Sequence, residues 1–376
     1  MYYENKKEKQ RKNIMAIFFM VIIIALLTSL NLRLQLINEK NMETDYSTQK
    51  LEETKENLLF EDNDEKNEYS FIEEASHAVV GISKLKSQDK EIFGITNQVV
   101  GQGSGVIITD NGYILTNQHL VGNKYGSCYV TLANGKSFDG SVIWSDENID
   151  LSIVKIPGAA LSHLELVDAK KVNLGEDVYA IGNPIGFEFQ RTVTKGIVSG
   201  LDRTIKIEEN GKFSYMEDLI QTDSTINAGN SGGALINSKG ELIGINTIKI
   251  PEAEGMGFAV SIDIVKPIID KLVNTGKFEE AYLGIYGFDK EVIPYLDDTI
   301  KLDSGIYVDS VSMDGPVFNS GIISGDIITK IDGVSLNKMS DLRKYIYSKN
   351  PGDKVKLTVH RKFRDYETEV TLGMNI

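Results

Sequence analysis

The sequence predicts a mainly β fold, with a smaller α+β domain at its C-terminal end and a membrane-spanning helix near its N-terminus. Three observations predict this fold class. Short apolar runs rich in β-branched residues recur from Phe71 onward, and turn signals such as Asn111-Gly112 and Pro157-Gly158 separate them. Residues 277–376 combine similar runs with one helical pattern. The stretch Ile14–Leu30 is apolar and carries no charged residue.

Composition limits the function classes. A length of 376 residues predicts two or three domains, and a net charge of −14 disfavours nucleic acid as a partner. The single cysteine, Cys128, excludes an intramolecular disulfide. The four histidines are scattered and no two lie at metal-ligand spacing, so neither a metal nor a cofactor site is predicted. The histidines are His77, His119, His163 and His360.

The N-terminal segment predicts a single-pass membrane anchor. Residues 1–13 are basic, and residues 14–32 form the expected transmembrane helix, which needs roughly 17–25 apolar residues. The basic flank predicts a cytoplasmic N-terminus with all later residues outside the membrane. The alternative is a cleavable signal peptide. No clear small-x-small cleavage site follows in Thr28–Arg33, which favours an uncleaved anchor.

Residues 31–70 form an acidic linker between the membrane and the folded part of the chain. Acidic residues outnumber basic ones eleven to five there, and few large apolar side chains are present. Such a segment cannot bury enough surface to fold alone. Leu51, Leu58 and Leu59 are compatible with a short amphipathic helix, but a solvated linker is the preferred interpretation.

Residues 71–276 predict an all-β domain of many short strands. Residues 208–212 predict a hairpin tip, and Ile262–Thr275 predicts a helix that Gly276 ends. The expected strands are Ala78–Ile82, Val99–Thr109, Tyr113–Thr116, Ser127–Leu132, Asp139–Trp144, Leu151–Ile156, Asp177–Ile181, Gly196–Leu201, Leu219–Thr222, Gly233–Ile236, Leu242–Lys249 and Gly257–Ser261.

A glycine-flanked serine in Asp223–Leu235 is the candidate nucleophile. A serine hydroxyl needs a base to take its proton and donors to hold the oxyanion that its attack creates. Glycines on either side allow a tight turn to aim the backbone N–H groups of Gly229 and Ser231 at one point. The alternative for this G-N-S-G-G run is a flexible loop, so other residues must decide.

His119 is the candidate base. It follows an apolar hairpin, Gly105–Thr116, at a strand end where scaffolds present catalytic groups. Asp150 precedes the apolar run Leu151–Val154 and is the candidate carboxylate that orients the histidine. The alternative for Asp150 is an ordinary turn residue at a strand end.

These motifs together closely resemble the HtrA (Deg) family of serine proteases, whose protease domain has the chymotrypsin fold. The resemblance runs from about Phe71 to the C-terminus and keeps the order His, Asp, Ser. Ala228 departs from it, because many relatives carry proline there. The matching stretches are Thr116–Val121, Asn148–Ile156, Asn183–Gly186, Thr192–Ser199, Gln221–Asn237 and Gly255–Val260.

The resemblance implies a chymotrypsin-like double β-barrel, with His119 and Asp150 in the first barrel and Ser231 in the second. Thr225 and Ile226 would line the substrate pocket where trypsin-like pockets for basic residues carry an acid, so cleavage after small or medium aliphatic residues is expected. By analogy the protein is a homotrimer, with Tyr69 and Phe71 at the contacting edge.

Residues 277–376 resemble a bacterial PDZ domain. Its strands are expected at Gly305–Ser312, Asp326–Ile331, Lys354–His360 and Thr368–Leu372, with a helix at Met339–Ser348. In this family the loop corresponding to Tyr282, Leu283, Gly284 and Ile285 offers backbone N–H groups to the C-terminal carboxylate of a peptide. The alternative is a plain edge strand. No role is predicted for residues 287–303.

The sequence therefore predicts a membrane-anchored serine endopeptidase that cleaves unfolded or damaged exported proteins and captures peptide C-termini. One alternative is an extracytoplasmic chaperone or stress-sensing peptide-binding protein with little proteolysis. A scaffold that has lost its activity is a further alternative, which the intact set of His119, Asp150 and Ser231 disfavours.

Overall fold

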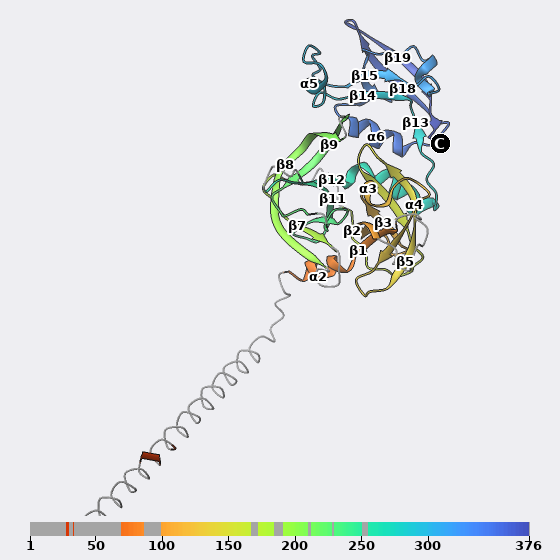
Figure 1. Cartoon of the computed structure of the whole chain (residues 1–376). Helices are drawn as coiled ribbons and strands as arrows, with labels where there is room; N and C mark the ends of the chain where they lie inside the picture. The colour runs from red at the N-terminus through yellow and green to blue at the C-terminus, as the bar shows by residue number, and fades with distance from the viewer. Residues whose placement is uncertain are drawn as a thin grey trace, which may run out of the picture. The chain divides into compact units, whose positions relative to one another are not determined.

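The computed structural model describes residues 69–85, 99–166, 172–183, 191–209, 212–227, 229–249 and 255–375, together with Thr28, Ser29 and Arg33. The predicted transmembrane helix at 14–32 and the acidic linker therefore lie almost entirely outside the described residues. Within the described residues, no helix is both long and apolar enough to span a membrane. Residues 69–376 form one compact unit (Figure 1).

The first barrel is a closed sheet of six strands in the order β1-β2-β3-β6-β5-β4. Alternating apolar residues fill its interior, among them Val80, Ile114 and Val154, each with no exposed surface. β3 pairs with β6 so that Thr116 lies opposite Ser152, which brings two strand ends together. The strands are β1 (Val79–Leu85), β2 (Val99–Ile107), β3 (Tyr113–Thr116), β4 (Ser127–Thr131), β5 (Ser137–Asp146) and β6 (Leu151–Lys155).

The second barrel is also closed, with the order β10-β11-β12-β9-β8-β7. β8 and β9 extend well beyond it as a long hairpin, in which Glu209 pairs with Lys212. The predicted hairpin tip is thus confirmed at its two described ends. The strands are β7 (Asp177–Gly182), β8 (Thr192–Glu209), β9 (Lys212–Thr222), β10 (Ala234–Asn237), β11 (Leu242–Lys249) and β12 (Gly257–Ser261).

Helices flank the barrels. An unpredicted helix, α2 (Ser70–His77), leads into β1 and places Phe71 against Tyr179 of β7, with ring centroids 5.4 Å apart. The predicted helix at Ile262–Thr275 is a 3₁₀ turn, η3 (Ile262–Ile264), followed by α4 (Lys266–Thr275). Gly276 ends α4 at φ 69°, as predicted, because this left-handed conformation favours glycine.

The C-terminal domain is a six-stranded sheet with its own core, in which Ile306, Ile328 and Val359 are fully buried. β14 lies at one edge of the sheet, and α6 (Met339–Ser348) forms over the predicted residues. The remaining elements are β13 (Ala281–Tyr282), β14 (Ile285–Phe288), α5 (Ile293–Leu296), β15 (Ile306–Val311), η4 (Pro316–Asn319), β16 (Ile327–Ile331), β17 (Val334–Ser335), β18 (Lys354–Arg361), β19 (Arg364–Thr371) and β20 (Gly373–Met374).

Candidate active site

His119 lies on a single helical turn, α3 (Gln118–Val121), directly after β3. Asp150 directly precedes β6, the partner of β3, so the pairing of these strands brings the two residues together. The Nδ1 atom of His119 lies 3.0 Å from Oδ1 and 2.9 Å from Oδ2 of Asp150. Because Nδ1 faces a carboxylate, it carries the ring proton, and Nε2 keeps the lone pair that a base requires.

The backbone of Asp150 is held in a sparsely populated conformation, with φ 51°. Three consecutive residues of the neighbouring strand end hold it there. The side-chain Nδ2 of Asn117 and the backbone N–H of Gln118 donate to the carbonyl of Asp150, at 3.1 and 3.2 Å respectively. The N–H of His119 donates to Oδ1 of Asp150 at 3.0 Å. The histidine segment therefore fixes both the main chain and the side chain of this aspartate.

Thr247 of β11 connects Asp150 to Ser231. The hydroxyl of Thr247 donates to Oδ2 of Asp150 at 2.7 Å, and its carbonyl accepts a hydrogen bond from Oγ of Ser231 at 3.2 Å. Among the described residues no hydrogen bond joins Ser231 to His119. The structure thus gathers the three predicted residues around one threonine, with the serine hydroxyl turned toward Thr247.

The turn that carries Ser231 is fixed by hydrogen bonds within its own backbone. The N–H of Asn230 donates to the carbonyl of Asn227, and the carbonyl of Asn230 accepts from Gly233, both at 3.0 Å. The N–H of Ser231 donates to no residue that the structure describes. It therefore remains available for an oxyanion, and Ser231 itself is 9 % exposed.

The predicted pocket residues occupy different environments. Thr225 is exposed, and its carbonyl accepts hydrogen bonds from Nδ2 of Asn230 at 2.9 Å and from Oγ1 of Thr194 at 3.0 Å. Ile226 is 2 % exposed and packs in the core of the second barrel. The ideal Cβ of an alanine at Gly257 would lie 2.4 Å from Ile226, so β12 approaches this isoleucine closely.

The predicted peptide-binding residues span a turn at the sheet edge. Tyr282 ends β13 and Ile285 begins β14, with Leu283 and Gly284 between them. Gly284 has φ 87°, and a side chain there would lie 2.7 Å from Gly315. The carbonyl of Leu283 accepts from Val317 at 3.2 Å, and that of Gly284 accepts from Ser312 at 2.9 Å. The turn is thus fixed through its carbonyl groups.

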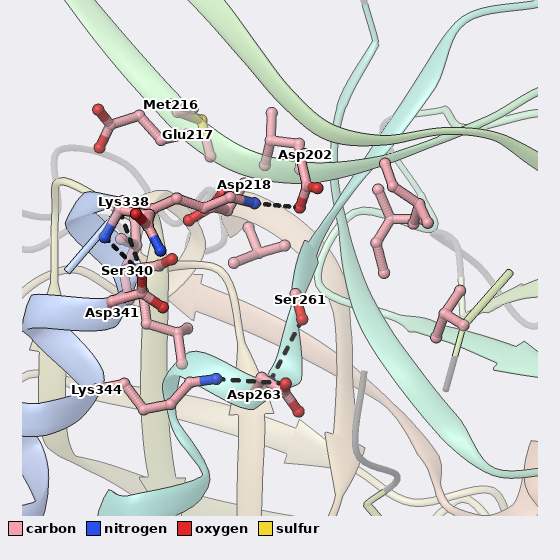
Figure 2. Close-up of a pocket in the computed structure, with 18 residues that line it drawn as sticks. Asp202, Met216, Glu217, Asp218, Ser261, Asp263, Lys338, Ser340, Asp341 and Lys344 are labelled. Atoms are coloured by element: carbon pink, nitrogen blue, oxygen red, sulfur yellow. Dashed lines mark hydrogen bonds and ion pairs between the residues drawn. The ribbon is translucent and has the colours of Figure 1, made fainter. Parts of the chain in front are cut away.

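A second polar cluster lies in a cavity of about 450 Å³ between the second barrel and α6 (Figure 2). Lys338, at the start of α6, forms ion pairs with Asp202 and with Asp218, the latter at 3.0 Å. Lys344 pairs with Asp263 at 3.3 Å. This cluster could not be predicted from the sequence, because its members come from distant segments and form no local motif.

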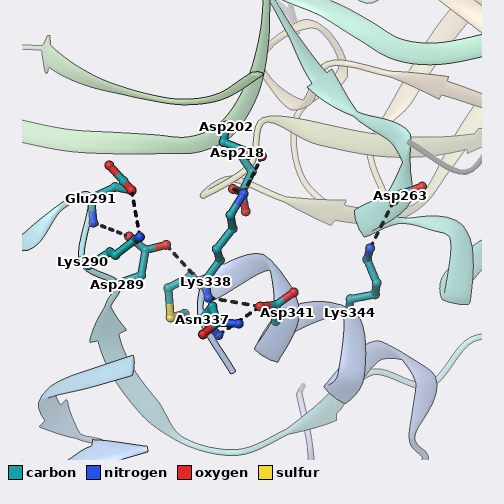
Figure 3. A network of polar contacts seen from close by, with 11 residues as sticks. Asp202, Asp218, Asp263, Asp289, Lys290, Glu291, Asn337, Lys338, Asp341 and Lys344 are labelled. Carbon is teal, nitrogen blue, oxygen red and sulfur yellow. Dashed lines mark hydrogen bonds and ion pairs between the residues drawn. The ribbon is translucent and has the colours of Figure 1, made fainter. Parts of the chain in front are cut away.

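Residues 287–303, for which no role was predicted, contribute to the contact between the C-terminal domain and the second barrel (Figure 3). Asp289 is buried and accepts a hydrogen bond from the N–H of Met339 in α6 at 3.1 Å. Phe288 and Tyr295 place their rings 6.4 and 5.8 Å from that of Tyr215 in the β8–β9 hairpin. The segment therefore packs the C-terminal domain against the second barrel.

The fold and site define a class of protein, a trypsin-like serine protease with a PDZ domain. The trypsin-like peptidase domain family matches residues 103–245, and the PDZ domain family matches residues 296–372. Serine protease Do-like HtrB of Bacillus subtilis is 35% identical over 320 residues, which cover 80% of this chain and 69% of that protein. Serine protease Do-like HtrA of Lactobacillus helveticus is 36% identical over 293 residues, which cover 74% and 70%. The chain belongs to the HtrA family of serine proteases.

Solved structures agree with this membership. A serine endoprotease from Yersinia pestis is 29% identical with a TM-score of 0.57, covering 83% of this chain and 99% of that one. The HtrA-type protease AlgW, solved with a tripeptide, is 30% identical with a TM-score of 0.60, covering 82% and 98%. The predicted family, the mainly β fold class and the enzyme class are thereby confirmed.

Proposed function

We propose that this protein is a membrane-anchored endopeptidase in which Ser231, His119 and Asp150 form a catalytic triad acting on unfolded or damaged exported proteins. The observation that carries the proposal is the set of contacts around Asp150. Both carboxylate oxygens lie within hydrogen-bond distance of the His119 ring, and Thr247 bridges Asp150 to Ser231. A well-hydrogen-bonded carboxylate that is only 13% exposed, behind a half-exposed histidine, is the arrangement that a histidine general base needs.

In the proposed reaction, the Ser231 hydroxyl rotates from the carbonyl of Thr247 toward Nε2 of His119. His119 takes the hydroxyl proton while Oγ forms a bond to the carbonyl carbon of the scissile peptide. The resulting imidazolium returns that proton to the leaving amine as the C–N bond breaks. Water then hydrolyses the acyl-enzyme through the same base. Asp150 keeps the ring oriented and stabilises its positive charge throughout.

The N–H groups of Gly229 and Ser231 are proposed to hold the oxyanion formed in each half of the reaction. Thr225 is proposed to line the entrance of the substrate pocket, with Ile226 behind it. Neither residue carries a charge, so the pocket offers no partner to a lysine or arginine. This supports cleavage after small or medium aliphatic residues.

Peptide C-termini are proposed to bind at Tyr282–Ile285, adding as a strand beside the exposed edge of β14. Two kinds of observation support this. The carbonyls of Leu283 and Gly284 accept the hydrogen bonds that fix the turn. The structures of AlgW include complexes with a tripeptide and with a decapeptide. Titration of residues 69–376 with free-acid and amidated forms of one apolar-ended peptide tests the proposal. Weaker binding of the amide is expected, and equal binding would contradict carboxylate capture.

The proposed location is the cell membrane, with a cytoplasmic N-terminus and the folded unit outside, on the strength of the basic residues 1–13 and the apolar run that follows. Protease treatment of intact cells should remove the C-terminal domain. A homotrimer is proposed by family analogy. Tyr69 is 47% exposed, whereas Phe71 packs on Tyr179 of its own chain, so Tyr69 is the better anchor of a trimer contact. Sedimentation of residues 67–376 as a monomer would contradict it.

The decisive experiment is hydrolysis of casein by residues 69–376, comparing the wild-type sequence with Ser231→Ala. The wild-type unit should release peptides, and the variant should not. Casein capture without hydrolysis by the wild-type unit would instead support the chaperone alternative.

A further inference from the structure

Ser104 of β2 is a fully buried serine that contacts the nucleophile turn of the other barrel. Its hydroxyl donates to the carbonyl of Gly229 at 2.7 Å and accepts from the N–H of Asn183 at 2.7 Å. Its N–H donates to the carbonyl of Ser231 at 2.8 Å. One residue of the first barrel thus binds the two carbonyls that flank the middle of the G-N-S turn.

These two bonds control the direction of the turn's peptide planes. In a trans peptide the carbonyl of one residue and the N–H of the next point in opposite directions, so the two bonds fix the Gly229–Asn230 and Ser231–Gly232 peptide planes. These planes adjoin the peptides that carry the N–H groups of Gly229 and Ser231, and they limit the rotation of those peptides. Gly229 lacks a Cβ, and sterics alone therefore leave its peptide free to rotate. The Ser104 hydroxyl restrains one side of the Gly229–Asn230 peptide by binding the carbonyl of Gly229, and the N–H of Asn230 restrains the other side by donating to the carbonyl of Asn227.

Close packing keeps Ser104 against this turn. Gly232 has φ 79°, and a Cβ on it would lie 2.2 Å from the carbonyl oxygen of Ser104. A Cβ on Gly103, the residue before Ser104, would lie 3.0 Å from the carbonyl oxygen of Ser231. The two main chains therefore approach each other directly at Gly232 and Gly103, and the hydroxyl of Ser104 has a fixed target.

We propose that Ser104 is a positioning residue for the oxyanion site: its hydroxyl holds the Gly229 carbonyl against the first barrel, so that the adjoining peptides of the turn keep the N–H groups of Gly229 and Ser231 aimed at one point. This inference rests on the proposed function. It assigns the first barrel a part in transition-state stabilisation besides carrying His119 and Asp150. Ser104 itself touches no reacting atom.

The test compares Ser104→Ala with the matched control Thr116→Val in residues 69–376. Thr116 is also fully buried, and its hydroxyl donates to the carbonyl of Ser104 at 2.7 Å, so its loss removes one buried hydrogen bond at the same residue without touching Gly229. The probes are a tripeptide p-nitroanilide with valine at the cleaved bond and the corresponding peptide boronic acid, whose oxygen occupies the oxyanion site. Ser104→Cys serves as a second variant, because a thiol fills the space but is a weak donor.

We expect Ser104→Ala to lower kcat about 10- to 100-fold with KM changed less than about threefold, since it disturbs oxyanion donors without removing them. Boronate affinity should fall in parallel with kcat/KM. Thr116→Val should keep kcat/KM and boronate affinity within about threefold of wild type. Ser104→Cys should give values of both between those of wild type and Ser104→Ala.

Unchanged kcat and boronate affinity in a folded Ser104→Ala would overturn the role of Ser104 while leaving the proposed function intact. Equal losses in Ser104→Ala and Thr116→Val would also overturn it, because they would indicate general loosening of the β2 segment. If Ser104→Ala does not fold, wild-type kinetics in Ser104→Cys would refute the proposal. Wild-type turnover that survives Ser231→Ala would refute the proposed function instead.

Discussion

Two clusters differ in how their carboxylates are hydrogen-bonded: the proposed catalytic cluster of His119, Asp150 and Ser231, and the interdomain cluster, formed by Glu217, Asp218 and Lys338 in the cavity between the second barrel and α6. At Asp150 both oxygens receive donors, from the main chain and ring of His119 and from the hydroxyl of Thr247. In the interdomain cavity, Oε1 of Glu217 and Oδ2 of Asp218 are buried without a donor among the described residues. Burial, together with the nearby carboxylate of Asp289, raises the pKa of Glu217 to about 8.

The hydrogen bonds around Asp150 hold one fixed arrangement of side chains, whereas the stability of the interdomain contact depends on pH. A fully satisfied carboxylate holds its neighbours in one arrangement, because any movement leaves a buried charge unpaired. A carboxyl group whose pKa lies near neutral pH changes its contribution to the free energy of unfolding as pH changes. Catalysis should therefore depend steeply on single atoms around Asp150, whereas variants in the interdomain cluster should change stability and leave the chemical step in place.

The largest expected effect is that of Ser231→Ala, which removes the proposed nucleophile. Activity on the p-nitroanilide should fall about 10⁴-fold or more, because the members of a triad act as a unit. The thermal midpoint should change by no more than a few degrees. Ser238→Ala, an exposed serine beyond β10, is the matched control and should keep wild-type activity. Comparable turnover in the two variants would mean that another residue is the nucleophile.

Thr247→Val should have the next largest effect on catalysis. It removes the 2.7 Å hydrogen bond to Asp150 but keeps the shape of the side chain and the carbonyl that meets Ser231. A hydrogen bond to a charged group contributes about 1.5–3 kcal/mol, so kcat/KM should fall roughly 10- to 100-fold. Thr247→Ser retains the hydroxyl and should recover most of the rate. Failure of serine to recover it would assign the loss to packing.

The members of the proposed catalytic cluster could be picked out from the sequence because they carry local signals. His119 follows a hairpin, Asp150 precedes an apolar strand, and glycines surround Ser231. Thr247 and Ser104 carry no such signal. Each sits inside an ordinary strand, and its role arises only when barrel closure places it beside another segment. The interdomain cluster was missed for the same reason, since Lys338 and Asp218 are joined by packing of two domains and by no pattern along the chain.

The helices also differ in whether they could be predicted from local sequence. The helix predicted at Met339–Ser348 forms as α6. The helix α2 was missed because it is only eight residues long and buries only Ala75 and Ser76. The segment 287–303 reads as polar, yet Asp289 within it is buried against α6, where hydrogen bonds to main-chain N–H groups replace water.

Lys338→Met should destabilise the folded unit by about 1–2 kcal/mol, because it leaves Asp202 and the largely buried Asp218 facing each other without a cation. The measurement is the urea unfolding midpoint at neutral pH. Lys290→Met is the matched control, since its ion pair with Glu291 is 3.9 Å long and half exposed, and less than about 0.5 kcal/mol is expected. Equal effects would show that Lys338 contributes nothing specific to the domain contact.

The smallest effect is a change in how stability depends on pH. Glu217 has a folded-state pKa of about 8, against an ordinary value of 4.5, so the folded protein binds the proton of this carboxyl group more tightly than the unfolded chain does. Below about pH 4.5 both states are protonated and this group has no effect. As pH rises from 4.5 to 8, the unfolded chain gains the ionised form first, and stability falls; above 8 the loss is complete.

Glu217→Gln removes this titration and should make the unfolding midpoint less sensitive to pH between 5 and 8.5. Glu279→Gln, an exposed glutamate, is the matched control and should follow the wild-type pH profile. Asp289, whose pKa burial also raises, lies close enough to add to the same pH dependence. Some pH sensitivity should therefore remain in Glu217→Gln and disappear further when Asp289→Asn is combined with it. If Glu217→Gln kept the wild-type pH dependence of the unfolding midpoint, water or local opening would be satisfying Glu217. The two clusters would then differ only in the arrangement of their hydrogen bonds.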